Sequence, residues 1–163
     1  MIFVTVGTHE QPFERLIKYI DNLKLDEEII IQSGYCNYSI KNCKYKKMMS
    51  IEEMDKYFKN ARIIITHAGP GSIMKALSLG KKPIVVAREV KYKEHVDDHQ
   101  VLFASSLEKE NKIINVKEIS NLERLIKEYD TFVKDGRVTF VSNNKNFNDR
   151  FKDIVNDLFK GDR

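Results

Sequence analysis

The chain has 163 residues, 42% of them hydrophobic and 32% charged, with a formal net charge of +4, which suits one globular domain with a substantial core. No apolar run approaches the ~18 residues of a membrane-spanning helix, and the first residues do not resemble a signal peptide, so we expect a cytoplasmic chain. The two cysteines, Cys36 and Cys43, are too few for a secreted disulfide framework.

Short apolar runs alternate with amphipathic stretches, which predicts an α/β fold with a Rossmann-like parallel sheet and flanking helices. We expect strands at residues 2–6, 28–32, 43–47, 62–66, 83–87 and 112–116. We expect helices at residues 13–23, 51–60, 72–79, 97–107, 118–133 and 143–159. Ser50 and Glu53 form a capping box for the second of these helices. We expect a single domain over residues 1–163, with a helical tail from about residue 118.

Two further patterns have more than one interpretation. Positive charges are grouped within residues 41–47, 81–82 and 88–93, where they suit phosphates, an anionic membrane, an acidic partner or simply solvated faces. The predicted helix at residues 143–159 has an aromatic-rich apolar side, which suits packing on its own domain or docking to a partner.

The strand expected at residues 62–66 leads into His-Ala-Gly-Pro-Gly-Ser. Gly69 and Gly71 lack side chains, so the main chain can approach a ligand closely, and Ser72 stands where the next helix is expected to begin. The first amides of a helix have no intrahelical partners and lie at the positive end of its dipole, so they can bind a phosphate. This turn is a candidate diphosphate site, although a simple tight connection would have the same composition.

A second glycine turn favours the phosphate interpretation. Gly7, Thr8, His9 and Glu10 follow the first strand, and in a parallel sheet both turns emerge at the carboxyl edge, where doubly wound folds bind ligands. Neither turn has the spacing of a P-loop or of a dinucleotide-binding turn, which disfavours ATPases, kinases and dinucleotide-dependent enzymes. We therefore expect a nucleoside diphosphate donor as substrate, and no cofactor.

The segment Glu-His-Val-Asp-Asp-His-Gln, residues 94–100, is the third polar feature. Its carboxylates, imidazoles and amide suit a ligand rich in hydroxyl groups, such as a sugar, and they equally suit a hydrated surface turn. Its histidines and aspartates are also metal-binding residue types. Their spacing matches no strong metal signature, so we expect no metal site.

Three motifs taken together, FVTVGTHEQPFERLI, THAGPGSIMKALSLGKKPIVV and HVDDHQ, resemble the carboxyl-terminal domain of glycosyltransferase family 28. The resemblance covers about residues 1–106. It extends to the small subunits of two-chain UDP-sugar transferases in dolichol-linked oligosaccharide, capsule and exopolysaccharide synthesis, and the first and third motifs favour the bacterial polysaccharide branch. It implies the donor-binding half of a GT-B fold, which binds a UDP-sugar without a metal.

The resemblance also implies which residues bind the donor. Gly69, Gly71 and Ser72 are expected to hold the phosphates, and Gly7 and Thr8 to lie beside the diphosphate or the sugar. His67 is expected at the strand end, as an organiser of the loop or a contact of the donor. The residues expected to face the donor sugar are Asp98, His99 and Gln100. Met49, ahead of the capped helix, is expected near the uracil.

Lys75 departs from the family pattern, because many members carry a glutamate there that binds the ribose hydroxyls. A lysine cannot accept those hydrogen bonds, although it can reach a phosphate or an acidic sugar. Lys75 therefore keeps an alternative open, in which the chain is a non-catalytic accessory subunit of a transferase. A nucleic-acid-binding domain is suggested only by the net charge and has no recognition motif.

A complete GT-B enzyme binds its donor in one Rossmann-like domain and its acceptor in another. The resemblance therefore implies a membrane-anchored partner subunit that binds a lipid-linked saccharide acceptor and recruits this chain to the inner face of the membrane. Transfer would invert the anomeric carbon and would need a general base near the acceptor hydroxyl. His9 and Glu10 are candidates for that base, unless the partner supplies it.

Overall fold

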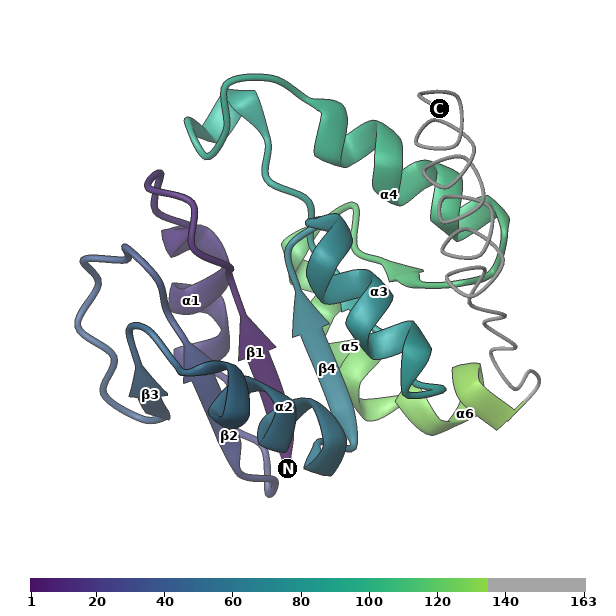
Figure 1. Cartoon of the computed structure of the whole chain (residues 1–163), viewed down its shortest axis with the longest axis horizontal. Helices are drawn as coiled ribbons and strands as arrows, with labels where there is room; N and C mark the ends of the chain where they lie inside the picture. The colour runs from purple at the N-terminus through teal and green to yellow at the C-terminus, as the bar shows by residue number, and fades with distance from the viewer. Residues whose placement is uncertain (135–163) are drawn as a thin grey trace, which may run out of the picture.

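The structure, a computed structural model, describes residues 1–134, so the helix expected at residues 143–159 lies outside the described part. Six short strands form one parallel sheet in the order β3-β2-β1-β4-β5-β6 (Figure 1). The strands are β1 (Ile2–Thr5), β2 (Ile29–Gln32), β3 (Lys44–Lys46), β4 (Ile63–Thr66), β5 (Ile84–Val85) and β6 (Ile114–Asn115). The predicted α/β class and parallel sheet are confirmed.

The central strands are apolar along almost their whole length. β1, β2 and β4 read IFVT, IIIQ and IIIT, and every residue in them is buried. This pattern is typical of parallel strands that are covered on both faces, and β-branched isoleucine suits the pleated surface. The edge strand β3, with the sequence KYK, is exposed throughout.

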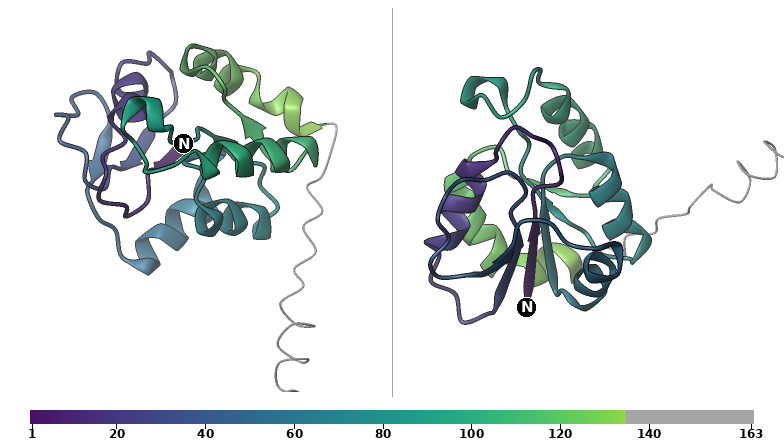
Figure 2. Two further views of the ribbon diagram at one scale, coloured as in Figure 1. Left: turned by 90° about the horizontal axis from the view of Figure 1, so that it is seen from above. Right: turned by 60° about the vertical axis from the view of Figure 1, so that its left-hand side comes forward.

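Helices cover both faces of the sheet (Figure 2). They are α1 (Glu14–Asp21), α2 (Ile51–Asn60), α3 (Pro70–Ser78), α4 (His99–Lys109), α5 (Leu122–Lys127) and α6 (Tyr129–Lys134), with 3₁₀ turns at Val90–Tyr92 and Ile119–Asn121. One core cluster joins α1 and α5 to one face of the sheet. Two further clusters join α2, α3 and α4 to the opposite face, so the domain has three layers.

Several predicted helix boundaries differ from the structure; the helix expected over residues 97–107, for example, is α4, His99–Lys109. The helix expected from Ser72 begins at Pro70, because proline is well tolerated at the first helical position, where an amide has no partner anyway. The helix expected over residues 118–133 is divided into a 3₁₀ turn and the two short helices α5 and α6. The capping box of α2 is confirmed: the Ser50 side chain accepts from the Glu53 amide, and the Glu53 carboxylate accepts from the Ser50 amide.

The strand order reverses between β1 and β4. From β1 the chain builds β2 and β3 on one side, then crosses to place β4, β5 and β6 on the other. β1 and β4 are paired in parallel, so the loops after Thr5 and Thr66 leave the sheet side by side at its carboxyl edge. Open α/β sheets bind ligands at such a reversal.

Within residues 1–134, no helix combines the length and the apolar character needed to cross a membrane.

Candidate functional site

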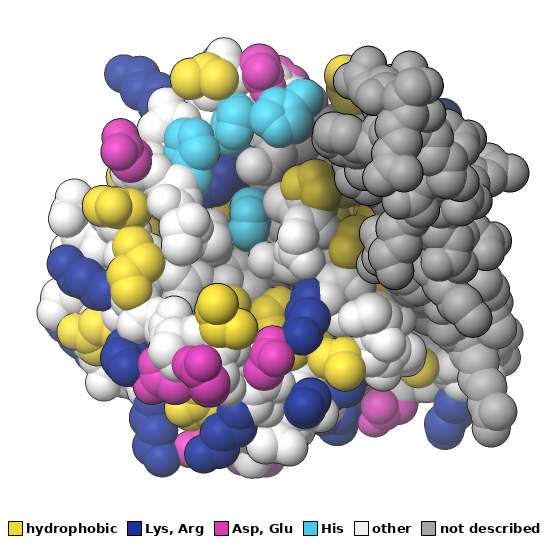
Figure 3. Space-filling view, in the orientation of Figure 1, with side chains coloured by type: hydrophobic (Ala, Val, Ile, Leu, Met, Phe, Trp, Pro, Cys, Tyr) yellow, Lys and Arg dark blue, Asp and Glu magenta, His cyan; other side chains and the backbone are white. Residues whose placement is uncertain are grey.

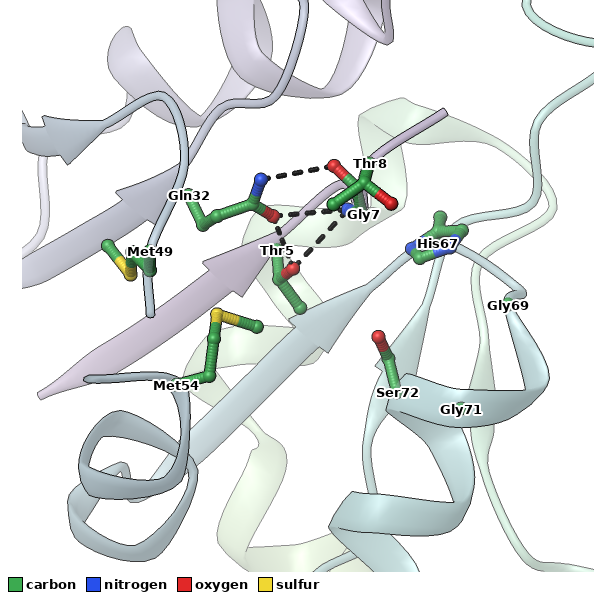
Figure 4. A pocket seen from close by; sticks show the side chains of 10 residues that line it. All are labelled: Thr5, Gly7, Thr8, Gln32, Met49, Met54, His67, Gly69, Gly71 and Ser72. Atoms are coloured by element: carbon green, nitrogen blue, oxygen red, sulfur yellow. Dashed lines mark hydrogen bonds between the residues drawn. The ribbon is translucent and has the colours of Figure 1, made fainter. Parts of the chain in front are cut away.

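A cavity of about 320 Å³ lies at the carboxyl ends of β1 and β4 (Figure 4). Its lining residues are Thr5, Gly7, Thr8, Gln32, Met49, Met54, His67, Gly69, Gly71 and Ser72. Both glycine turns contribute to the lining, so the prediction that they share one crevice is confirmed. We call this space the first cavity.

The amino terminus of α3 opens into the first cavity. Gly69 is the N-cap residue, and no side chain in the described part of the protein caps it. The first intrahelical hydrogen bond runs from the Ile73 amide to the Gly69 carbonyl, at 3.2 Å. Pro70 has no amide hydrogen, so the donors before that bond belong to Gly71 and Ser72. These two amides lie at the positive end of the α3 dipole.

His67 occupies the space between the two glycine turns. A β-carbon built on Gly69 would lie 2.1 Å from His67 Nε2, and one built on Gly7 would lie 2.6 Å from His67 Cε1. Gly7 also has a positive φ of 74°, which favours glycine. These two glycines make room for the imidazole. Gly71 differs, because within residues 1–134 a β-carbon there would meet no heavy atom closer than 4 Å.

The environment of His67 keeps its imidazole neutral. Burial, followed by the nearby positive charge of Arg88, lowers the pKa of His67 to about 4. The Thr66 hydroxyl lies 3.3 Å from His67 Nδ1. At neutral pH the ring is therefore an uncharged organiser of the two turns, and it neither attracts nor repels an anion by net charge.

Gln32, at the end of β2, holds the loop after β1 in place. Its Oε1 accepts hydrogen bonds from the Thr5 hydroxyl at 2.6 Å and from the Gly7 amide at 3.1 Å. Its Nε2 donates to the carbonyls of Gly7 at 3.0 Å and of Lys47 at 2.9 Å. One buried amide side chain thus uses four hydrogen bonds to position both the first glycine turn and the chain that enters α2.

The wall opposite α3 is apolar. Met49 precedes α2 and Met54 lies in its second turn, and both sulfur-containing side chains line the first cavity (Figure 4). Methionine is flexible and polarisable, so these side chains can adapt to a flat ring. The first cavity therefore has one face of amide donors and one apolar face.

A second cavity of about 540 Å³ adjoins the first. Thr8 and His67 line both cavities, and the second is also lined by His9, Glu10 and Gln100. Gln100 is 5% exposed, and its Oε1 accepts from the Arg88 amide at 3.3 Å. The structure therefore brings together predicted site residues from the first glycine turn, the second glycine turn and the amino-terminal end of α4, around two adjoining spaces.

Arg88 joins the loops around the second cavity. It is 1% exposed and donates to the carbonyls of Val6 at 3.0 Å and of Glu94 at 3.0 Å, and also to that of Gln11. The buried Glu94 carboxylate in turn pairs with Arg15 of α1 at 2.8 Å. These charged side chains thus form an internal brace between the loop after β1 and the loop after β5, a role that was not among the interpretations offered for the positive group at residues 88–93.

Three predicted site residues do not line either of these cavities. Lys75 pairs with Asp55 of α2, with 2.7 Å between Nζ and Oδ1. The Asp98 carboxylate accepts from the Val90 amide at 2.9 Å, so it shapes its own loop. His99 is exposed and contacts the carboxylate of Asp97. Their predicted roles at the donor stay predictions.

Several residues of the site were missed by sequence reasoning. They are Thr5, Gln32, Met54 and Arg88. For Thr5 and Gln32 a signal exists: each is the polar last residue of an otherwise apolar buried strand, and they are paired in register across β1 and β2. Met54 and Arg88 carry no such local signal, because their positions depend on packing between distant segments.

Comparison with known proteins adds the family. The glycosyltransferase family 28 C-terminal domain matches residues 1–158. The chain is 31% identical over 116 residues to the UDP-N-acetylglucosamine transferase subunit ALG13 of Kluyveromyces lactis, covering 71% of this chain and 50% of that protein. It is also 31% identical over 109 residues to ALG13 of Candida albicans, covering 67% of this chain and 31% of that protein. The chain thus matches half or less of the length of these two relatives.

Among solved structures, MurG of Acinetobacter baumannii has a similar fold, with a TM-score of 0.52 and 19% sequence identity. The match covers 77% of this chain and 40% of the MurG chain. At this identity the likeness concerns the fold alone, and it agrees with the Rossmann-like parallel sheet described above.

Proposed function

Because this chain belongs to glycosyltransferase family 28, we propose that it is the UDP-sugar-binding subunit of an inverting glycosyltransferase. The observation that carries this proposal is the uncapped amino terminus of α3 in the described structure, where the Gly71 and Ser72 amides face the first cavity. A diphosphate is the ligand that best matches two unpaired donors at the positive end of a helix.

The rest of the first cavity suits the remainder of a UDP group. Met49 and Met54 offer an apolar wall for the flat uracil ring, opposite the α3 amides. The second cavity adjoins the phosphate end through Thr8 and His67, and it has polar lining groups on His9, Glu10 and Gln100. We assign the donor sugar to this second cavity, with Gln100 as the amide best placed for its hydroxyls.

The reaction follows from this arrangement. An acceptor hydroxyl would attack the anomeric carbon from the open side of the second cavity while the bond to the diphosphate breaks, which inverts the configuration. The α3 amides and dipole would stabilise the charge on the departing UDP, without a metal ion at that point. His9 and Glu10 line the second cavity, and we propose them as this chain's candidates for the general base, unless the partner supplies it.

We propose that the acceptor site belongs to a membrane-anchored partner glycosyltransferase subunit. One observation supports this: the ALG13 relatives are named as subunits of a UDP-N-acetylglucosamine transferase. The partner would present a lipid-linked saccharide and hold this chain at the inner face of the membrane, in capsule or exopolysaccharide synthesis.

A calorimetric comparison of UDP and UMP tests the donor site. If the α3 amides bind the second phosphate, UDP should bind the purified chain at least about tenfold more tightly than UMP, since one charge-assisted hydrogen bond contributes about 1.5–3 kcal/mol. Equal affinities would remove the diphosphate assignment. If neither nucleotide binds, with or without the partner, the accessory-subunit alternative holds instead.

A further inference from the structure

Imidazoles gather beside the second cavity. His9 follows β1, His95 lies between β5 and α4, and His99 is the first residue of α4. The rings of His9 and His95 have centroids 4.9 Å apart, and those of His95 and His99 lie 4.6 Å apart, nearly perpendicular. Figure 3 shows histidine side chains grouped on this face of the molecule. Asp97 lies between the last two histidines in sequence and carries the only carboxylate in the group.

Three of these four side chains, those of His95, Asp97 and His99, carry ligand atoms that lie close enough together to bind one metal ion. One ligand atom each of His95, Asp97 and His99 lies within 4.8 Å of the other two. His95 Nδ1 and Asp97 Oδ1 are 3.5 Å apart, and His99 Nδ1 contacts the same oxygen. Tetrahedral zinc, with bonds of about 2.0–2.1 Å, needs ligand atoms about 3.4 Å apart. The first pair meets this requirement, and a small rotation of the exposed His99 brings in the third ligand.

We propose that His95, Asp97 and His99 form a binding site for a divalent transition metal ion such as Zn²⁺. Two imidazoles and one carboxylate are ligands that zinc accepts readily, whereas Mg²⁺ and Ca²⁺ prefer sites made of oxygen atoms. Three protein ligands leave a fourth coordination position open.

The exposure of the cluster favours this use. His95 is only 9% exposed at its side chain, while Asp97 and His99 are open to an incoming ion at 59% and 56%.

The chain contains few histidines and cysteines outside the proposed site that could bind zinc instead. The protein has four histidines and two cysteines, and the only histidine besides His9, His95 and His99 is His67, enclosed by the two glycine turns. Burial raises the pKa of Cys43 to about 11 and also raises that of Cys36, so neither thiol supplies a thiolate near neutral pH. Tight binding of zinc would therefore report on the proposed site.

The experiment is a Zn²⁺ titration of the full chain at pH 7.5 against a colorimetric chelator. We expect one ion per chain, and an affinity lowered on the order of 100-fold by Asp97→Asn or by His99→Gln, because each removes a ligand. Asp26→Asn removes an exposed carboxylate elsewhere on the surface and should leave zinc binding unchanged. Co²⁺ in place of Zn²⁺ should give the visible absorption of a four-coordinate site.

Two results would overturn the proposal: no stoichiometric zinc binding by the wild-type chain, or the same affinity in the wild type and both ligand variants. Circular dichroism of each variant shows whether the fold is kept, which is expected because both altered side chains are exposed. The titration contains no nucleotide, so its outcome is independent of the proposed donor site.

Discussion

The imidazole of His67 lies so close to Gly69 that a β-carbon at residue 69 would sit 2.1 Å from Nε2. Two residues further on, within the described part of the chain, Gly71 has no such neighbour. The same turn therefore contains one glycine that makes room for a protein side chain and one that leaves space in front of two helix amides. Each can be tested separately.

Alanine at these two positions should have opposite effects. Gly71→Ala should fold as well as the wild type, or be up to about 1 kcal/mol more stable, because alanine favours helix and limits the unfolded chain. The added methyl group would occupy the space in front of the amides of residues 71 and 72, so the affinity for UDP should fall. Gly69→Ala should lose about 1–3 kcal/mol of stability, because the methyl collides with His67. Chemical unfolding and calorimetry measure both, and the reverse pattern would contradict these roles.

Gln32→Glu should destabilise the protein by about 2–4 kcal/mol at pH 7.5, because an ionised carboxylate cannot donate to the Gly7 and Lys47 carbonyls that the amide now satisfies. Protonation restores one donor, so part of the loss should disappear at pH 5.5. Urea unfolding of both proteins at the two pH values checks this. If the variant is less stable than the wild type by the same amount at both pH values, the lost hydrogen-bond donors are not the cause.

His67 should make stability depend on pH. Its folded pKa of about 4 lies below the value near 6.5 of an unfolded histidine, so between these values the unfolded chain binds a proton that the folded chain does not. The free energy of unfolding should therefore decrease as pH falls through this window, by about 2 kcal/mol between pH 7.5 and pH 5 from this residue.

The control for this effect is His67→Gln, which removes the titrating ring. Urea unfolding at pH 7.5 and pH 5 should show a smaller decrease for the variant than for the wild type. His95, whose pKa is also lowered, contributes a decrease of the same sign to both proteins, so the difference between them isolates His67. Equal decreases in both proteins would show that residue 67 does not titrate in this way.

Lys75 should matter little for either stability or UDP binding. It pairs with Asp55 across α2 and α3 with both side chains more than a third exposed, and such pairs contribute about 0.2–1 kcal/mol. A double-mutant cycle with Lys75→Met and Asp55→Asn measures that coupling. Calorimetry with Lys75→Met should give nearly the wild-type UDP affinity. A large loss of affinity would instead support the sequence-based expectation that this lysine contacts the donor.

The sequence predicted those parts of the fold that depend on local pattern. Apolar runs located β1, β2 and β4, and the capping box at Ser50 located α2 to the residue. The glycine turns after β1 and β4 predicted a shared crevice, because loops that follow neighbouring parallel strands leave the sheet at the same edge. The start of α3 was missed by two residues, since Pro70 was read as part of the turn when it occupies the first helical position.

What the sequence did not reveal depends on partners far apart in the chain. Gln32 ended an apolar run, but its bonds to Gly7 and Lys47 exist only once β2 lies between them. Arg88 and Lys82 belong to groups of positive charge for which the sequence suggests only surface roles, in contact with solvent, phosphates, a membrane or a partner, yet they are 1% and 6% exposed. The approach of the His9 ring to the His95 ring likewise depends on the fold, because these two residues follow different strands, β1 and β5.

The central claim is that the amino terminus of α3 binds the diphosphate of a UDP-sugar. A titration of ¹⁵N-labelled chain with UDP, followed by two-dimensional NMR, tests it most directly. We predict that the amide signals of Gly71 and Ser72 shift most and saturate together with the binding heat, because these two donors face the first cavity. UDP that binds to saturation while both amide signals stay in place would contradict the claim.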